Sequence, residues 1–478
     1  MEGFRCPIQT AAQNQPQSPA LLSNDGSLTY QQLASYIEDA ARRLSKQGIK
    51  ANDTVIIPSA SSWQIIVILF ALWRLKAITC LIPARLPETQ LQFLKSQFKG
   101  DVHFISSSQT DFLTKGLSFQ NLTDDLAADL SSQRFDFVFD QPATVILTSG
   151  TTGIPKLVCH TIGNHFWNAK GSNENILLRM NDGWLLSLPL HHVSGLGILF
   201  RCFLAGARIF LPDADEKPID VLLRSKEITH VSLVSTQFKR LLEDKQATVR
   251  LKALKAILLG GGTIPTELVK QARQYNLALY LTYGLTEAAS QVATTVDPRQ
   301  PYQVKPLLHR EVKISPSGEI FVRGETLFQG YLQNGRLQRP FDEEGWFATN
   351  DLGEMDRDGN LRIIGRKDHM FISGGENIYP EEIEAALLRQ ESILEAIIFS
   401  QEDEEFGLIP IALLKFKKGY HISRGELRKA LQNQLLPFKI PKKFFLLPDE
   451  NLFTLDKECR KRLWLRWQKD QIKYQEIL

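Results

Sequence analysis

The segment from Thr148 to Lys156 reads TSGTTGIPK and holds the residue types that bind phosphate. Glycines let the backbone wrap around an anion, hydroxyls donate hydrogen bonds, and Lys156 adds a positive charge. In P-loop NTPases the lysine follows a glycine and precedes Ser or Thr. Lys156 instead lies between Pro155 and Leu157, so a simple P-loop NTPase is disfavoured. An ordinary Gly/Thr turn is the alternative that composition leaves open.

Two further segments hold polar residues that could bind a ligand or take part in catalysis. Glu287 ends the run YGLTE, and its carboxylate suits a magnesium ion on nucleotide phosphates, which takes one or two protein carboxylates. By itself this run could equally be a turn before a helix. The pair His191 and His192 suggests a metal site or a general base, but no other His or Cys cluster lies nearby at ligand spacing. A packed histidine is the commoner outcome.

The elements that must position these residues alternate between helical patterns and short apolar runs. Examples are the helical TYQQLASYIEDAARRLSKQG and the strand-like DTVIIPS, QPATVILTSG, THVSLVST, LKAILLGGG and LALYLTYG. This rhythm predicts an α/β fold whose strands are mostly parallel. Ligands of such sheets bind at the carboxyl ends of the strands, so we expect several of these loops to converge on one site.

A second organisation begins near Gly365, where the sequence GRKDHMFISGGENIYP is rich in charge and glycine. A helical run opened by Pro380, two apolar runs, and a capping box at Ser423 and Glu426 follow it, which is typical of a small α+β domain. We therefore predict an N-terminal domain over residues 1–365 and a C-terminal domain over residues 366–478, with a hinge near Asp368.

Composition excludes several classes of protein. The 56 basic and 53 acidic residues give a net charge of +3, too balanced for a dedicated nucleic-acid binder. The five cysteines show no CxxC spacing, which disfavours a disulfide framework or a zinc site and favours a reducing, cytoplasmic setting. The most apolar stretch, Ile65 to Trp73, is too short to span a bilayer, and we predict a buried helix and no integral membrane association. The oligomeric state is left open, a homo-oligomer included.

The loop at Thr148–Lys156 resembles the signature of the adenylate-forming superfamily, which includes acyl-CoA synthetases, luciferases and peptide-synthetase adenylation domains. Four further segments match in the same order: YGLTE (283–287), TND (349–351), GRKD (365–368) and LDKECRKRL (455–463). The resemblance covers essentially the whole chain. It implies a large N-terminal adenylate-forming domain with layered, mostly parallel sheets, a small mobile C-terminal α+β domain, and the use of ATP, Mg²⁺ and coenzyme A.

The resemblance also implies a role for each matching residue. Tyr283 packs on adenine, Glu287 helps to hold magnesium, and Asp351 accepts both ribose hydroxyls. Asn350 replaces a glycine of the family, but asparagine tolerates left-handed backbone better than most residues. The full nucleotide-binding set is Thr148, Ser149, Gly150, Thr151, Thr152, Gly153, Lys156, Gly261, Gly262, Tyr283, Gly284, Thr286, Asp351 and Arg366.

Catalysis is assigned by the resemblance to Lys457, together with Lys156 and Glu287. Lys457 aligns by its spacing to the residues that follow it, but Asp456 stands where the family has glycine. Lys461 is the fallback, and a solvated basic helix is the alternative for the whole segment.

The resemblance extends to the acceptor side. Asp368 is placed at the hinge, and Gly374 and Gly375 belong to a loop that faces the active site when the coenzyme A thiol attacks.

The segment LPLHHVSGLGILFR, with YGLTEAASQVAT, KPLLHREVKI and ISGGENIYPEEIE, most resembles the o-succinylbenzoate–CoA ligase family of menaquinone synthesis. This places the acid substrate at His192, Ser194, Gly195 and Arg201. Because that substrate is a dicarboxylate, Arg201 could bind the carboxylate that is not activated. A salt bridge from Arg201 to an acidic residue of the chain is the alternative.

Other functions remain open. Within the superfamily these are another aryl- or fatty-acid-CoA ligase and an enzyme that loads a carrier protein. From another class, a catalytically silent homologue that binds nucleotide or acyl-adenylate is supported by Asp456 and Asn350.

Overall fold

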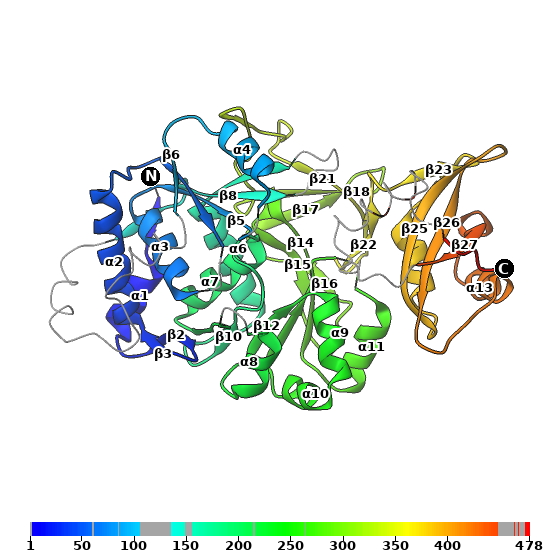
Figure 1. The fold of residues 1–478 in the computed structure, drawn as a ribbon, viewed down its shortest axis with the longest axis horizontal. Helices are drawn as coiled ribbons and strands as arrows, with labels where there is room; N and C mark the ends of the chain where they lie inside the picture. Colours follow the sequence, from blue (N-terminus) through cyan, green and yellow to red (C-terminus); the bar gives the residue numbers. More distant parts are fainter. Residues whose placement is uncertain are drawn as a thin grey trace.

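Two large mixed sheets form the N-terminal part of the chain, and a smaller α+β part follows at the other end of the elongated molecule (Figure 1). The computed structural model describes residues 2–59, 62–84, 86–105, 135–148, 155–213, 216–262, 264–447, 463, 467 and 474–478. The α/β prediction is confirmed. Within the described ranges, no helix combines the length and the apolar character that a membrane crossing requires.

The nine-stranded sheet is parallel in its centre and antiparallel at both edges. Its strands, in spatial order, are β16 (Val304–Pro306), β15 (Ser290–Thr295), β14 (Leu279–Leu285), β13 (Ala256–Leu259), β12 (His230–Leu233), β10 (Gly183–Leu185), β11 (Arg208–Phe210), β2 (Pro19–Ser23) and β3 (Gly26–Thr29). Alternate residues of its strands face opposite cores, since Ile257 and Leu259 pack in one cluster while Ala256 and Leu258 pack in the other.

The first of these two cores is covered by four helices that follow one another along the green part of the chain in Figure 1. They are α8 (Pro218–Arg224), α9 (Ser235–Glu243), α10 (Lys245–Lys252) and α11 (Thr266–Gln274). The second core lies between the nine-stranded sheet and the seven-stranded sheet. It takes in α1 (Pro7–Asn14), α2 (Tyr30–Lys46), α3 (Trp63–Arg74), α6 (Ile162–Asn175) and α7 (Val193–Ala205).

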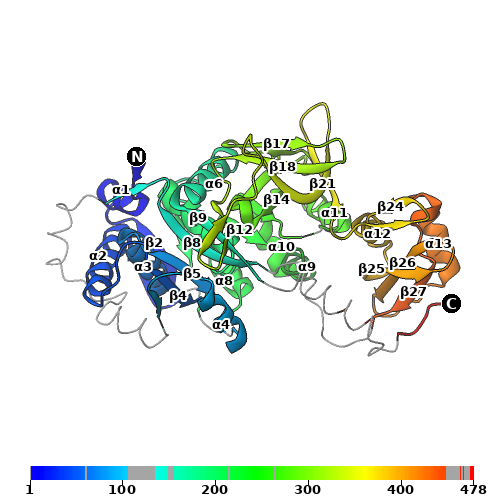
Figure 2. The ribbon, with the colours of Figure 1, turned by 90° about the horizontal axis from the view of Figure 1, so that it is seen from above.

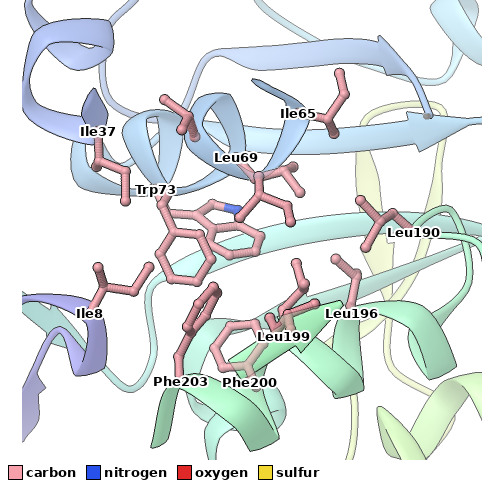
Figure 3. Close-up of a cluster of buried hydrophobic side chains, with 14 of the residues drawn as sticks. Ile8, Ile37, Ile65, Leu69, Trp73, Leu190, Leu196, Leu199, Phe200 and Phe203 are labelled. Carbon is pink, nitrogen blue, oxygen red and sulfur yellow. The ribbon is translucent and has the colours of Figure 1, made fainter. Parts of the chain in front are cut away.

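Helix α3 is the buried helix that its apolar sequence predicts, because every residue from Ile65 to Trp73 is at most 3% exposed. It packs against α7, with Leu69 and Trp73 facing Phe200 and Phe203 (Figure 3). The indole Nε1 of Trp73 donates hydrogen bonds to the carbonyl of Ala143 at 3.0 Å and to the hydroxyl of Thr79 at 3.1 Å. The packing of α3 against α7 fixes the position of α7, which carries part of the candidate site.

The seven-stranded sheet holds the strand that leads into the predicted phosphate loop. Its order is β20 (Arg336–Gln338), β19 (Gly330–Gln333), β9 (Lys156–Thr161), β8 (Pro142–Thr148), β5 (Ile78–Ile82), β4 (Thr54–Pro58) and β6 (Val102–Phe104), and α4 (Glu88–Ser96) lies beside it. Strands β8 and β9 pair antiparallel with Thr148 opposite Lys156. The predicted phosphate loop therefore joins a β-hairpin, whereas the loop of P-loop NTPases leads into a helix.

A four-stranded antiparallel sheet forms the third layer of the N-terminal part and leads to the C-terminal part (Figure 2). Its order is β17 (Arg310–Ile314), β18 (Glu319–Gly324), β21 (Phe347–Met355) and β22 (Leu361–Arg366). The strands β1 (Gly3–Arg5) and β7 (Asp136–Val138) form a separate antiparallel pair. The short 3₁₀ helix η2 (Thr286–Ala288) follows β14.

The C-terminal part has its own apolar core, built from residues between Ile378 and Ile477. Its elements are β23 (Phe371–Ser373), β24 (Glu376–Ile378), α12 (Pro380–Leu387), β25 (Ile393–Asp403), β26 (Gly407–Phe416), α13 (Arg424–Gln432), η3 (Pro437–Lys439) and β27 (Lys443–Leu446). Pro380 begins α12 and the capping box of Ser423 and Glu426 begins α13, as predicted. The domain boundary at 365 and 366, which falls near the end of β22, stays a prediction.

Candidate active site

The two large sheets meet where η2 follows β14. The ring Nε2 of His160 on β9 donates to the carbonyl of Thr286 at 2.7 Å, and the amide of Phe328 donates to the carbonyl of Glu287 at 2.8 Å. These bonds hold the YGLTE segment of one sheet against β9 and the residues just before β19 of the other. Thr286, Glu287 and Lys156 are thereby brought to one place from separate parts of the chain.

A hydrogen-bonded carboxylate forms the first part of the candidate site. Asp351 is 8% exposed, and its two oxygens accept from the Tyr283 hydroxyl at 2.7 Å and from Arg366 Nη1 at 2.9 Å. Burial and the adjacent charge of Asp351 raise the pKa of Tyr283 well above its ordinary value, so this phenol remains a donor. We call Tyr283, Asp351 and Arg366 the nucleotide-side network.

Arg366 also reaches the predicted hinge. Its Nε and Nη2 donate to the two carboxylate oxygens of Asp368 at 2.9 and 3.0 Å. Burial lowers the pKa of Arg366, but its bonds to Asp368 and Asp351 outweigh this effect and raise the pKa above its ordinary value. The guanidinium is therefore a permanent cation between the two carboxylates.

The turn before Asp351 tolerates the asparagine that stands where the family has glycine. Asn350 has a φ of 59°, in the left-handed region that asparagine accepts. The backbone N–H of Asn350 donates to Glu319 Oε1 at 3.2 Å, and Lys367 Nζ donates to Glu319 Oε2 at 2.7 Å. Sequence reasoning missed Glu319, because nothing in the run SPSGEIFV marks a residue that supports a turn far along the chain.

The second part of the candidate site is built around Glu287. Its Oε1 accepts from the Tyr331 hydroxyl at 2.7 Å, and Lys156 Nζ lies 4.7 Å from the centroid of the Tyr331 ring. Burial, followed by the charge of Glu287, raises the pKa of Tyr331 above its ordinary value. Tyr331 was missed by sequence reasoning. It lies near Lys156 because β19 pairs with β9, and no local pattern in the sequence predicts that pairing.

The donor set around Glu287 suits a magnesium ion bound mainly by nucleotide phosphates. Among the described residues no group of three or more His, Cys, Asp or Glu side chains is close enough to hold a metal ion. A single carboxylate is what Mg²⁺ takes when phosphates and waters supply its other ligands. Glu287 therefore fits a nucleotide-bound ion and does not fit a dedicated metal cage.

A β-bulge between Tyr283 and Gly284 shapes the backbone beside the nucleotide-side network. A Cβ atom at Gly284 would collide with the carbonyl oxygen of Ser290, so only glycine permits this close approach. Past the bulge, Gly284 pairs with Gln291 across β14 and β15. The glycines Gly261 and Gly262 follow β13, the neighbour of β14.

Helix α7 carries the residues predicted to bind the acid. It begins after His192, and a Cβ atom at Gly195 would collide with the carbonyl of Pro189, which explains the glycine there. Burial lowers the pKa of His191 to about 4, so this ring is neutral near pH 7. Ser194 lies in the first turn of the helix.

Arg201 lies two turns farther along α7 and is 1% exposed. Its Nη1 donates to Gln291 Oε1 at 3.0 Å, and its Cζ lies 4.6 Å from the Trp184 ring centroid. None of the ion pairs in the described part of the chain includes Arg201, so the alternative of a salt bridge to an acidic residue is wrong for these residues. Burial lowers its pKa to about 10, which leaves the guanidinium protonated at neutral pH.

The remaining predicted residues fall into two groups. Ser149, Gly150, Thr151, Thr152, Gly153 and Lys457 lie outside the described residues. Gly374 and Gly375 form the turn between β23 and β24, where the Gly374 amide donates to the carbonyl of Phe406 at 2.9 Å. Gly374 therefore contacts the β25–β26 hairpin of its own C-terminal part.

Comparison with known proteins agrees with this geometry. Residues 8–332 match the model of the AMP-binding enzyme family, and residues 382–453 match the AMP-binding enzyme C-terminal domain. The 2-succinylbenzoate–CoA ligase of Haemophilus influenzae is 37% identical over 88% of this chain and 89% of its own length. The enzyme of the same name from Escherichia coli is 34% identical over 90% of this chain and 91% of its own length.

Solved structures give the same result. The o-succinylbenzoate CoA synthetase of Bacillus subtilis, in complex with the acyl-adenylate intermediate OSB-AMP, superposes with a TM-score of 0.78 at 29% identity, over 94% of this chain and 95% of that chain. The predicted resemblance to the adenylate-forming superfamily is confirmed. The chain belongs to the AMP-binding enzyme family, in the branch that contains these 2-succinylbenzoate–CoA ligases.

Proposed function

We propose that this chain is an AMP-forming ligase that joins 2-succinylbenzoate to coenzyme A, an intermediate step of menaquinone synthesis, in the cytoplasm. The succinyl carboxylate attacks the α-phosphorus of ATP and pyrophosphate leaves, which forms an acyl-adenylate. The coenzyme A thiol then attacks the acyl carbonyl, loses its proton and releases AMP. The observation that carries the proposal is Arg201, a buried cation with no acidic partner among the described residues, beside the nucleotide-side network.

The first step needs no general base, because a carboxylate is already an ionised nucleophile. The protein positions the two reactants and neutralises the charge that grows on the phosphate oxygens. Asp351 would accept the ribose hydroxyls while Tyr283 and Arg366 hold it, and Lys156 would bind phosphate oxygens. A magnesium ion at Glu287 would supply further charge neutralisation when bound.

Arg201 would select the acid. Its guanidinium folds back along α7 toward the predicted acid-binding turn, since a Cβ atom at Gly197 would lie 3.1 Å from Nη1. Gln291, which binds Arg201, is the cross-strand partner of Gly284 and thus adjoins the nucleotide-side network. The aromatic carboxylate of 2-succinylbenzoate would complete the ion pair that Arg201 lacks, in a charge-assisted and bidentate contact.

The second step would require the C-terminal part to turn about Asp368. The residue before it, Lys367, is bonded to Glu319 of the N-terminal part, and the residue after it, His369, is bonded to Glu381 of α12. Asp368 thus lies between one residue bonded to the N-terminal part and one bonded to the C-terminal part, where a rotation of the backbone would turn one part relative to the other. The turn would withdraw Lys457 and bring Gly374 and Gly375 to the acyl-adenylate, which excludes water until the thiol arrives.

The test is pyrophosphate release from ATP, with and without coenzyme A, for aromatic acids, fatty acids and 2-succinylbenzoate. Activity with 2-succinylbenzoate alone, lowered about 10²-fold or more by Lys457→Ala, is the expected result. Equal activity with fatty acids would replace the proposed substrate, and no activity with any acid would favour a catalytically silent homologue.

A further inference from the structure

We propose that Gln291 is a positioning residue that orients the Arg201 guanidinium without neutralising it, and so makes the acid pocket select a dicarboxylate. This inference rests on the proposed function. Gln291 lies on β15, far in sequence from α7, and is 2% exposed.

The amide of Gln291 is fixed in one orientation by a directional chain of hydrogen bonds. Its Nε2 donates to the hydroxyl of Thr294 at 2.9 Å. The hydroxyls of Thr294 and Thr282 lie 2.9 Å apart, and Thr282 donates to the carbonyl of Ala293 at 3.1 Å. Because the Thr282 hydroxyl donates its hydrogen to that carbonyl, the Thr294 hydroxyl donates to the Thr282 oxygen, and the Thr294 oxygen accepts from the Gln291 amide. The carbonyl oxygen Oε1 is therefore left to face Arg201.

The backbone of Gln291 is held as firmly as its side chain. Its carbonyl accepts from Arg310 Nη1, and from Asn168 Nδ2 at 2.9 Å. Asn168 lies on α6 and Arg310 on β17, so two elements besides its own strand fix this residue. A residue whose backbone and amide are both fixed can hold a guanidinium in one direction.

Three further groups near Arg201 are neutral, and the buried carboxylate in this region, Asp182, is ion-paired with Lys255 at 2.5 Å. One is the Trp184 ring, on which His230 stacks at a centroid distance of 5.0 Å. Burial lowers the pKa of His230 to about 4, so that ring carries no charge near pH 7. The neighbouring thiol of Cys202 is likewise kept neutral, because burial raises its pKa above the ordinary value. The Nε of Arg201 is buried and has no hydrogen-bond partner among the residues that the structure describes.

An amide and a carboxylate at position 291 would have nearly the same shape but opposite consequences. A carboxylate would form an ion pair with Arg201 inside the protein, and the second carboxylate of a substrate would then meet a neutral pair. It would also lose the donor that binds Thr294. The amide supplies a weak acceptor, which orients the guanidinium and leaves its charge for the ligand.

The test is Gln291→Glu in the full chain, assayed by pyrophosphate release with 2-succinylbenzoate and with 4-oxo-4-phenylbutanoate, which lacks the aromatic carboxylate. The ratio of kcat/KM for the two acids should fall about 10²-fold, through KM for 2-succinylbenzoate. Gln291→Met, which keeps the length but offers no acceptor, should lower the ratio about 10-fold. Gln141→Met, a buried glutamine that binds the carbonyl of Trp73, is the matched control and should leave the ratio unchanged.

Equal losses for both acids in Gln291→Glu and Gln291→Met would overturn the inference, because a purely structural role does not distinguish the acids. An unchanged ratio in both variants would overturn it as well. If wild type does not prefer the dicarboxylate, the proposed substrate fails together with this inference. If wild type prefers it and Arg201→Leu removes that preference while the two Gln291 variants do not, Gln291 alone is refuted.

Discussion

The nucleotide side and the acid side of the candidate site treat charge in opposite ways. Arg366 lies between two carboxylates, Asp351 and Asp368, and every one of these charges is compensated within the protein. Arg201 is more deeply buried, yet it bonds to a neutral amide and faces an aromatic ring. A ribose brings hydroxyl donors and needs a prepared acceptor, whereas a second carboxylate brings its own charge. Among the described residues Arg201 thus has no carboxylate partner, and the proposed ligand would supply one.

The largest effect is expected from Arg201→Leu, which removes the uncompensated charge. The kcat/KM for 2-succinylbenzoate should fall about 10³-fold, since removal of one partner of a buried ion pair leaves the other without a counter-charge. Steady-state pyrophosphate release with 2-succinylbenzoate and with 4-oxo-4-phenylbutanoate measures the contrast. Arg224→Leu, which removes an ion-paired arginine at the end of α8, should change neither value. A loss no larger for the dicarboxylate would show that Arg201 does not bind its second carboxylate.

The next effect concerns His160, which supports the nucleotide side from β9. Burial lowers its pKa from the ordinary 6.5 to about 4, so the unfolded chain binds this proton more tightly. The resulting stability is present above pH 6.5 and is lost as the pH falls toward 4, by about 3 kcal/mol. Denaturant unfolding at pH 7, 5.5 and 4 should show a shallower loss for His160→Gln than for wild type. The exposed His421→Gln is the control, and identical profiles for all three proteins would contradict the expectation.

A smaller effect is expected from Asp351→Asn, which keeps the shape of the side chain but removes the charge between Tyr283 and Arg366. The KM for ATP should rise about 10²-fold, because an amide accepts ribose hydroxyls less strongly and leaves Arg366 without one of its two ion pairs. The KM for the acid should stay within about threefold of the wild-type value. Initial rates over a range of ATP and acid concentrations separate the two. A rise in both constants would mean that the two sides are not independent.

The smallest effect is expected from Tyr331→Phe. The ring beneath Lys156 remains, but Glu287 loses its hydroxyl donor, which should lower kcat about 10-fold and raise the Mg²⁺ concentration at half-maximal rate. Magnesium titrations of pyrophosphate release measure both values. Tyr302→Phe, at a tyrosine that is 52% exposed, is the control. An unchanged magnesium requirement would show that Tyr331 does not position Glu287.

Local sequence patterns predicted much of the fold. The helical run of α2, the apolar α3 and the strand-like runs of β4, β8, β12, β13 and β14 all form the expected elements. Period and capping are properties of neighbouring residues, so they can be seen before any packing is known. The antiparallel edges of the two large sheets were not predicted, because strand direction depends on which strands become neighbours in space.

For the candidate site, too, the residue types could be predicted from the sequence, but the contacts between distant elements could not. The residue types at Lys156, Glu287 and the YGLTE run, together with a family resemblance, were enough to propose nucleotide chemistry, since the chemistry of a side chain is written in the sequence. The bonds from Tyr331 to Glu287 and from Glu319 to the turn at Asn350 join separate elements, and no local signal marked them.

By itself the sequence determined which groups are present and where the backbone can bend, down to the left-handed turn that Asn350 accepts. Tertiary structure alone decided that Arg201 would be buried beside Gln291, a residue 90 positions away, and not beside a carboxylate. The physical reason is that the state of a charge depends on its neighbours across the packed core. Those neighbours come from elements whose proximity is set by the association of whole sheets and helices.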